Sequence, residues 1–200
     1  VLGPRLKYSC CWFDNNQSTL EEAEIKMMEL YIKRAEIEDG QTILDLGCGW
    51  GSLTLFLAER FPNSVIYSVS NSNDQIKFIQ EKSKNMGFSH VHASVQDANS
   101  LDLPTMFDRV ISIEMFEHIR NYKLLLEKIK HILKPDGFLF VHIFCHKTAA
   151  YLYEEKGEND WMTRNFFRGG IRPSENIFSY FEEFKIKKTW MINGTQYTRT

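Results

Sequence analysis

The stretch from Ile43 to Ala58 constrains the fold more than any other part of the sequence. Apolar residues that favour β-structure lead to Asp45, then to alternate glycines, and then to an apolar run that begins at Ser52. This order predicts a buried strand, a tight turn and the start of a helix. Alternate glycines allow a sharp turn and let a ligand lie against exposed N–H groups. In an open parallel sheet, that edge is where ligands bind.

The spacing of the glycines separates two classes of ligand. A dinucleotide fingerprint would place its third glycine at position 52, where this chain has Ser52. The glycines are instead Gly47, Gly49 and Gly51, and this D-x-G-x-G-x-G pattern resembles motif I of the S-adenosylmethionine-dependent methyltransferases. A glycine-rich turn without a ligand is the alternative. The strand before the turn and the helix after it make a ligand site the better interpretation.

Strand and helix signals alternate five times along the chain, which predicts a doubly wound α/β sheet. A methyltransferase sheet would continue to a seventh, antiparallel strand, so we expect a Rossmann-like class I sheet that is truncated before that last strand. We expect a cap segment and helix over residues 1–41 and the methyltransferase domain over residues 42–200. The expected strands are residues 43–46, 64–69, 90–94, 107–113, 137–144 and 184–192, and the expected helices are residues 19–37, 73–86, 122–133, 174–183 and one that begins at Ser52.

Composition excludes several functions. The net charge is −2 and no basic stripe occurs, which argues against a nucleic-acid partner. No apolar run is long enough to cross a bilayer, and no signal peptide is visible. The four cysteines suggest no disulfide framework, so we expect a reducing, cytoplasmic setting.

Polar residues follow the second and third expected strands at the ligand edge. Asn71 could bind ribose hydroxyls through its amide, with Gln75 supporting it from the start of the next helix. A polar turn with an asparagine cap is an equal alternative. Asp97 follows the third strand, where an adenine amino group could donate to it.

Glu114, Glu117 and His118 form the most informative polar cluster, directly after the fourth expected strand. In a helical turn the three side chains would share one face. Two carboxylates beside an imidazole shift each other's proton affinity and suit general-base catalysis. An exposed charged turn is the alternative, and the position at the ligand edge favours the catalytic interpretation.

His142, Cys145 and His146 raise the question of a metal site. They have no fourth ligand at metal-site spacing, and His142 lies inside an apolar strand. We therefore expect no metal, and a histidine that lies in the core or points into the cleft.

The sequence as a whole resembles the cyclopropane-fatty-acid synthase family, and within it the coclaurine N-methyltransferase branch. The resemblance is carried by residues 2–9, 19–27, 45–51, 116–118 and 145–148, and by Asp160-Trp161 with the aromatic run that follows. It implies S-adenosylmethionine as cofactor and S-adenosyl-L-homocysteine as product. The expected cofactor contacts are Tyr8, Ser9, Asp45, Gly47, Cys48, Gly49, Gly51, Asn71, Gln75, Asp97, Ala98 and Ile113.

The resemblance also implies roles around the reaction itself. Glu114, Glu117 and His118 match the family's catalytic stretch, while Trp161 and aromatic neighbours such as Phe166 would face the substrate. Other residues are closer to the lipid-modifying branch: His142, Tyr197 and the stretch 169–174. In that branch the glutamate at position 117, with a histidine and a tyrosine that match His142 and Tyr197, helps to hold a bicarbonate ion.

Three functions are therefore open. The first is methylation of the nitrogen of an aromatic-ring-bearing amine, such as a tetrahydroisoquinoline. The second is addition of a methylene group to an unsaturated phospholipid chain, with bicarbonate as base. The third is a truncated cofactor-binding module without activity. As partners we expect a small-molecule amine, no nucleic acid, no transmembrane segment, and at most a second copy of the chain.

Overall fold

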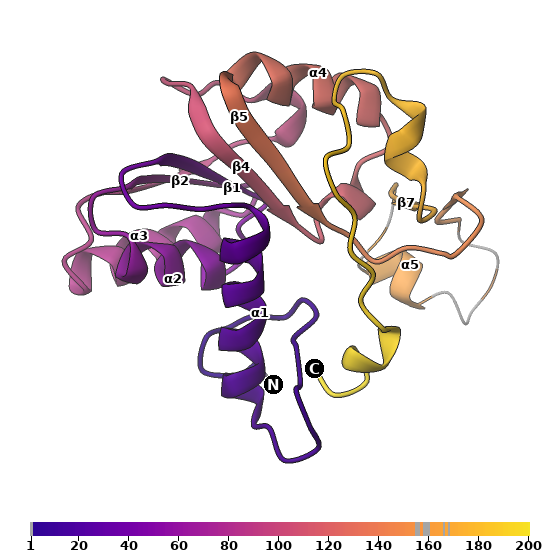
Figure 1. Ribbon diagram of the computed structural model, residues 1–200, viewed down its shortest axis with the longest axis horizontal. Coiled ribbons are helices and arrows are strands. Elements are labelled where there is room, and N and C mark those ends of the chain that lie inside the picture. The colour runs from indigo at the N-terminus through magenta and orange to yellow at the C-terminus, as the bar shows by residue number, and fades with distance from the viewer. Residues whose placement is uncertain (1, 155–156, 158–160, 166, 168) are drawn as a thin grey trace.

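A five-stranded parallel sheet in the order β3-β2-β1-β4-β5 forms the centre of the computed structural model, which describes residues 2–154, 157, 161–165, 167 and 169–200 (Figure 1). Its strands are β1 (Thr42–Leu46), β2 (Val65–Ser70), β3 (Val91–Val95), β4 (Phe107–Ile113) and β5 (Leu133–His142). The α-helices are α1 (Leu20–Arg34), α2 (Ser52–Arg60), α3 (Asn73–Asn85), α4 (Tyr122–Ile132) and α5 (Trp161–Asn165). Short elements complete the described chain: 3-10 turns η1 (Ala98–Ser100), η2 (Phe116–His118), η3 (Ile177–Tyr180) and η4 (Gly194–Gln196), and the antiparallel pair β6 (Tyr151–Leu152) and β7 (Ile171–Arg172).

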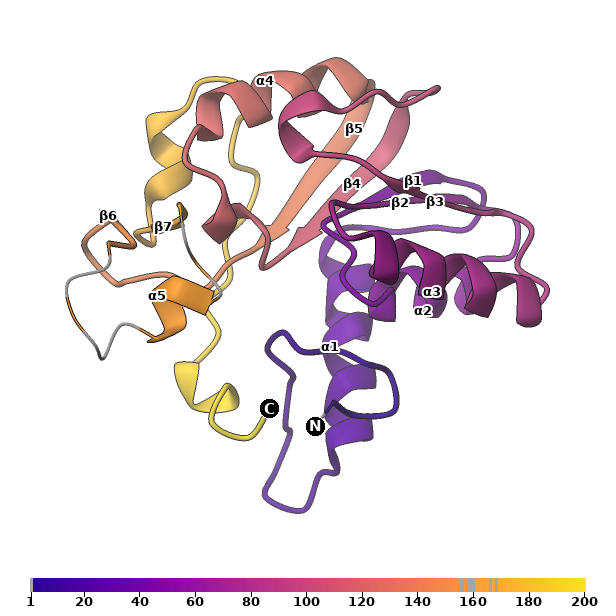
Figure 2. The same ribbon diagram turned by 180° about the vertical axis from the view of Figure 1, so that it is seen from behind.

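Helices cover both faces of the sheet, as the doubly wound pattern predicts. α2 and α3 lie on one face and α4 on the other (Figures 1 and 2). Alternate residues of β1 belong to the two faces: Ile43 packs with α1 and α2, whereas Leu44 and Leu46 pack with α4. The expected fold class is therefore confirmed. None of the helices in the described ranges is long and apolar enough to cross a membrane.

The local signals for α1 act as the sequence predicts. The Thr19 hydroxyl accepts the Glu22 N–H at 3.2 Å, and the Glu22 carboxylate accepts the Thr19 N–H at 2.8 Å. This capping box satisfies N–H groups that the first turn leaves free. The helix ends at Arg34, three residues before the expected end at Ile37.

Two expectations for the last part of the chain are wrong. Within residues 174–183 the chain forms the short 3-10 turn η3 (Ile177–Tyr180) instead of an α-helix. Phe178 and Phe181 pack on Tyr122 of α4, and these tertiary contacts override the local pattern. Residues 184–192 run beside β5 in Figure 1 without forming a strand. The Lys187 ammonium lies 4.0 Å from the centre of the Phe138 ring, so this segment contacts side chains of β5 instead of pairing with its backbone.

Candidate active site

The glycine turn after β1 has the left-handed backbone that favours glycine. Gly47, Gly49 and Gly51 have φ values of 84°, 54° and 79°. A Cβ atom on Gly49 would lie 2.8 Å from the Tyr8 hydroxyl, and one on Gly47 would overlap with Met115. These glycines are therefore required both by the backbone and by the close approach of neighbouring side chains.

Three N–H groups of the turn are already bonded within the chain. Those of Gly47 and Cys48 donate to the Val69 carbonyl at 2.9 and 3.0 Å, and that of Gly51 donates to the Cys48 carbonyl at 2.9 Å. The expectation that the N–H groups of the turn lie open to a ligand is therefore wrong for these three. The first two bonds fix the turn to the end of β2, and the third closes the turn on itself.

Asp45 of β1 is hydrogen-bonded to α2. Its carboxylate is 2% exposed and accepts the Thr54 hydroxyl at 2.7 Å, and burial raises its pKa to about 6. A small cavity of about 40 Å³ lies over the turn beside it. The expected cofactor contacts that line this cavity are Tyr8, Ser9, Asp45, Gly47, Cys48, Gly49 and Ile113.

The structure shows which residue after β2 caps helix α3. Ser72, and not Asn71, is the N-cap of α3, and its hydroxyl accepts the Gln75 N–H at 3.4 Å. Asn71 is exposed, so the asparagine-cap interpretation is wrong. The Gln75 side chain is held by Ser70, whose hydroxyl donates to it at 2.7 Å.

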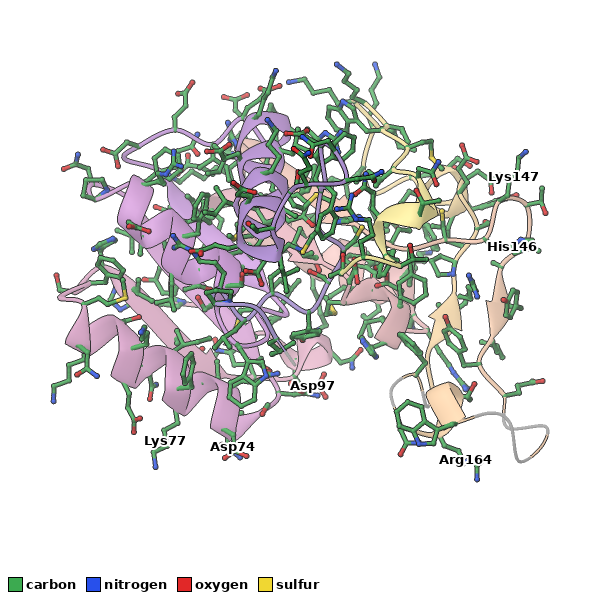
Figure 3. All side chains as sticks on the ribbon, turned by 90° about the horizontal axis from the view of Figure 1, so that it is seen from below. Asp74, Lys77, Asp97, His146, Lys147 and Arg164 are labelled. Atoms are coloured by element: carbon green, nitrogen blue, oxygen red, sulfur yellow. The ribbon has the colours of Figure 1, made fainter. Side chains whose placement is uncertain are left out.

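Asp97 lies after β3 and caps the short turn η1. Its Oδ1 accepts the backbone and side-chain N–H groups of Asn99, each at 2.8 Å. Ala98 is the first residue of that turn. Asp97 is exposed, and Figure 3 labels it together with Asp74 and Lys77 of α3.

Glu114 directly follows β4 and adopts the left-handed conformation, with a φ of 51°. Its N–H donates to the His142 carbonyl at 2.7 Å, and its Oε1 accepts the Cys10 N–H at 3.0 Å. Hydrogen bonding from Tyr197 and the nearby charge of Lys7 favour the carboxylate, but burial is the larger effect and raises the Glu114 pKa.

Glu117 is completely buried in η2. Its Oε1 accepts the Phe144 N–H at 2.8 Å, whereas its Oε2 has no hydrogen-bond partner in the described part of the chain. Burial, followed by the charge of Glu114, raises the Glu117 pKa to about 8. Gly170 packs directly against the Glu117 carbonyl, where a Cβ atom would overlap with it.

The expected single helical face of Glu114, Glu117 and His118 is wrong. The left-handed backbone at Glu114 separates it from the turn that carries the other two residues. Glu117 points into the core, while His118 is exposed and stacks on Phe167 with ring centres 5.2 Å apart. The two carboxylates still interact electrostatically.

His142 is bonded within the core of the site. The Tyr31 hydroxyl lies 2.7 Å from its Nδ1, and burial lowers the His142 pKa to about 3, so the ring is neutral at physiological pH. His146 uses its Nδ1 to accept the Thr148 and Ala149 N–H groups at 3.2 and 3.0 Å. Within the described ranges, no three His, Cys, Asp or Glu side chains are grouped as metal ligands.

An open groove of about 2050 Å³ lies between β5 and residues 184–194. One end of the groove is lined by Glu114, His118 and a set of aromatic rings: Phe144, Tyr153, Phe167 and Tyr197. Phe167 is the centre of this set, with ring centres 4.7 Å from Tyr153 and 5.3 Å from Phe144. Trp161 is 58% exposed on α5, and Phe166 lies outside the described residues.

Sequence reasoning assigned no role to several groups that complete this site. Two are backbone N–H groups, at Cys10 and Phe144, and any residue could supply them, so no sequence signal would find them. Lys7 lies in the stretch that carries the family resemblance and could have been singled out there. Gly170 could have been noted as one of two adjacent glycines in an aromatic region.

Figure 3 shows His146 and Lys147 at the opposite side of the view from Asp74 and Lys77.

The sheet order, the helices on both faces and the glycine turn after β1 define the fold of the class I S-adenosylmethionine-dependent methyltransferases. Within that class, the chain belongs to the mycolic acid cyclopropane synthetase family, which it matches over residues 1–200.

Relatives with assigned names come from both branches of this family. (S)-coclaurine N-methyltransferase from Thalictrum flavum subsp. glaucum is 45% identical over 201 residues, which are 99% of this chain and 56% of the relative. Cyclopropane-fatty-acyl-phospholipid synthase from Escherichia coli strain K12 is 27% identical over 203 residues, covering 100% of this chain and 50% of the relative. The chain thus spans about half the length of the curated relatives it matches.

Solved structures give the same picture. A crystal structure of coclaurine N-methyltransferase bound to N-methylheliamine and SAH is 43% identical, with a TM-score of 0.84 over 90% of this chain and 54% of that one. A cyclopropane synthase from Mycobacterium tuberculosis is 24% identical, with a TM-score of 0.78 over 90% of this chain and 66% of that one, and shows the shared fold.

Proposed function

We propose that this protein transfers a methyl group from S-adenosylmethionine to the nitrogen of an aromatic-ring-bearing amine such as a tetrahydroisoquinoline. The observation that carries the proposal is the buried Glu117 carboxyl group, which is fixed by the Phe144 N–H and keeps one oxygen without a partner in the described structure. It lies in the turn η2 after β4, and the next residue of that turn, His118, lines the aromatic groove. The 45% identity to a coclaurine N-methyltransferase supports the same substrate class.

The cofactor is proposed to bind at the glycine turn, where Tyr8 closes over Gly49 and leaves no room for a Cβ atom. Glycine at these positions also lets a ligand approach the backbone of the turn closely. When bound, S-adenosylmethionine supplies an activated methyl group and leaves as S-adenosyl-L-homocysteine. The residues proposed to hold it are Tyr8, Ser9, Asp45, Gly47, Cys48, Gly49, Gly51, Asn71, Gln75, Asp97, Ala98 and Ile113. In this proposal residues 1–41 form the cap and residues 42–200 the methyltransferase domain.

Glu117 is proposed as the general base. An alkylammonium ion has no free lone pair, so its proton must be removed before the nitrogen can attack the methyl group. A substrate cation beside Glu117 lowers the pKa of that carboxyl and thereby favours the form that can accept the proton. Glu114 would hold the ammonium by its charge, and His118 would help to receive the proton at the edge of the groove.

The aromatic rings would bind the substrate. Phe144, Tyr153 and Phe167 present ring faces that attract a cationic nitrogen and pack against an apolar ring system. Positioning of the two reactants supplies much of the rate enhancement, since the methyl donor is already activated. The further residues proposed to face the substrate are Trp161, Phe166, His142 and Tyr197.

Methylene addition to an unsaturated phospholipid chain is the second candidate. It is favoured by His142 and Tyr197, both of which line the groove that Glu114 borders. A bicarbonate ion held by these two residues and Glu117 would accept the proton in that reaction. The lipid reaction requires added bicarbonate and lipid vesicles, whereas the amine reaction requires neither.

The test combines binding with product analysis. Calorimetric titration with S-adenosylmethionine measures binding, and mass spectrometry then follows a tetrahydroisoquinoline amine and an unsaturated phospholipid. A gain of one methyl group on the amine supports the proposal, and a gain of one methylene group on the lipid supports the second candidate. Binding without either product would leave a cofactor-binding module.

Two variants test the role of the base. Glu117→Gln should lower turnover by about 10²- to 10⁴-fold while the cofactor Kd stays nearly constant, because only the proton acceptor is lost. Glu81→Gln on the exposed surface of α3 is the matched control and should turn over like the wild type. Equal loss of turnover and cofactor binding in Glu117→Gln would contradict this role.

The four free cysteines support a cytosolic setting for the reaction.

A further inference from the structure

Residues 7–15, here called the N-terminal segment, and residues 193–200, here called the C-terminal turn, lie side by side near the two marked chain ends in Figures 1 and 2. The two stretches are separated by almost the whole sequence. Side chains of the C-terminal turn bond to backbone groups of the N-terminal segment, and this joint lies next to Glu114.

Gln196 makes the central connection between them. The Phe13 N–H donates to its Oε1 at 2.8 Å, and its Nε2 donates to the Phe13 carbonyl at 3.3 Å. One side-chain amide thus satisfies both backbone groups of one residue, as a neighbouring β-strand would. Phe13 itself is buried, so these backbone groups are partly shielded from water.

Two further contacts hold the same pair of segments. The Cys11 N–H donates to the Thr200 hydroxyl at 3.1 Å. The Arg199 side chain donates to the Asn15 carbonyl at 2.9 Å, and its guanidinium carbon lies 4.1 Å from the centre of the Phe13 ring. Together these contacts form a clasp between the N-terminal segment and the C-terminal turn.

Both halves of the clasp reach Glu114. The N-terminal segment contributes the Cys10 N–H, which donates to Oε1 at 3.0 Å. The C-terminal turn contributes Tyr197, the residue after Gln196, which lines the same groove as Glu114 and favours the charged form of that carboxyl group. The position of Glu114 therefore depends on the two segments staying in register with each other.

The N-terminal segment is also held by hydrogen bonds of its own. The buried Lys7 ammonium donates to the Ser9 carbonyl at 3.0 Å, to the Ser9 hydroxyl at 2.6 Å and to the Cys10 carbonyl at 2.6 Å. The Trp12 N–H donates to the Ala23 carbonyl of α1 at 3.1 Å. These bonds connect the backbone around Cys10 to its neighbours on both sides of the segment.

We infer that Gln196 is a positioning residue that acts through Phe13 to hold the Cys10 N–H and Tyr197 on the Glu114 carboxylate. This inference rests on the proposed function, because it assigns Gln196 an effect on the methyl-transfer step through Glu114. Gln196 itself touches neither Glu114 nor the glycine turn in the described contacts. Through the clasp, Gln196 would thus determine the position of the Glu114 side chain directly after β4.

The test compares Gln196→Met with Gln17→Met in the full protein. Methionine keeps the length of glutamine but cannot make either bond to Phe13, and Gln17 is exposed outside the clasp. Loss of two hydrogen bonds should speed hydrogen exchange of the amides of residues 10–13 by roughly tenfold, while exchange in β1 stays unchanged. The kcat of Gln196→Met should fall by roughly tenfold per folded molecule with the thermal midpoint nearly unchanged, and Gln17→Met should match the wild type in every measurement.

The outcomes separate the inference from the function beneath it. Faster exchange in residues 10–13 together with a lower kcat supports the inference. An active wild type whose kcat is unaffected by Gln196→Met overturns the inference alone, and so does unchanged exchange in residues 10–13. A wild type that binds S-adenosylmethionine but methylates no amine overturns the proposed function, and with it the claim that the clasp acts on catalysis.

Discussion

The buried carboxyl group of Glu117 should make folding stability depend on pH. Its pKa is about 8 in the folded protein, against 4.5 for an unperturbed glutamate. At about 1.4 kcal/mol per pH unit, this difference corresponds to on the order of 5 kcal/mol between the neutral and the charged form. The main cause is burial, because the loss of hydration outweighs what the backbone N–H groups of Glu117 and Phe144 return to the carboxylate.

The sign follows from the protons bound in each state. Between pH 4.5 and about 8, Glu117 stays protonated in the folded protein but is ionised in the unfolded chain. The folded state therefore binds more protons, and its stability falls as pH rises through this window. The contribution is fully present below pH 4.5 and is lost once the pH passes about 8.

The measurement is urea unfolding of the wild type and of Glu117→Gln, followed by tryptophan fluorescence from about pH 5 to about pH 9. A glutamine stays neutral, so the variant lacks this titration but shares every other one with the wild type. The variant should gain several kcal/mol on the wild type as pH rises. If the difference between their free energies of unfolding is flat with pH, Glu117 is not a buried neutral acid and the reasoning is refuted.

Three further substitutions, with Gly87→Ala as a control for the first, test the packing of the site. Gly49→Ala and Gly87→Ala both force alanine into a positive φ, so each variant should lose about 1 kcal/mol of stability. Only Gly49→Ala should weaken S-adenosylmethionine binding, because Gly87 has no neighbour within 4 Å of the added Cβ. Gly170→Ala should lower the thermal midpoint and kcat together by displacing the general base; an unchanged kcat would contradict the contact. Tyr31→Phe should lose about 1–3 kcal/mol in urea unfolding, because it leaves the buried His142 ring nitrogen without its partner; full stability would show that water replaces the hydroxyl.

Local sequence patterns were sufficient to predict the sheet, because the residues of each strand show by themselves that they favour β-structure. The alternation of strand and helix, the capping box at Thr19 and the glycine turn are short-range features whose physics acts within a few residues. The same approach failed for residues 174–192, where an apolar pattern was satisfied by packing on α4 and β5 without a new helix or strand. The spacing of apolar residues along the sequence shows which side chains are buried on folding. It does not show against which surface of the protein they pack.

The sequence by itself determined the doubly wound sheet, the position of the ligand edge, and the candidate roles of Glu114 and Glu117. Only the tertiary structure decided how these two carboxylates differ. Glu114 is held by Cys10, 104 residues away, whereas Glu117 is buried against Phe144 with one oxygen unpartnered in the described structure. Proton affinity is set by burial and by neighbours in space, and such neighbours come from distant segments that no local pattern connects.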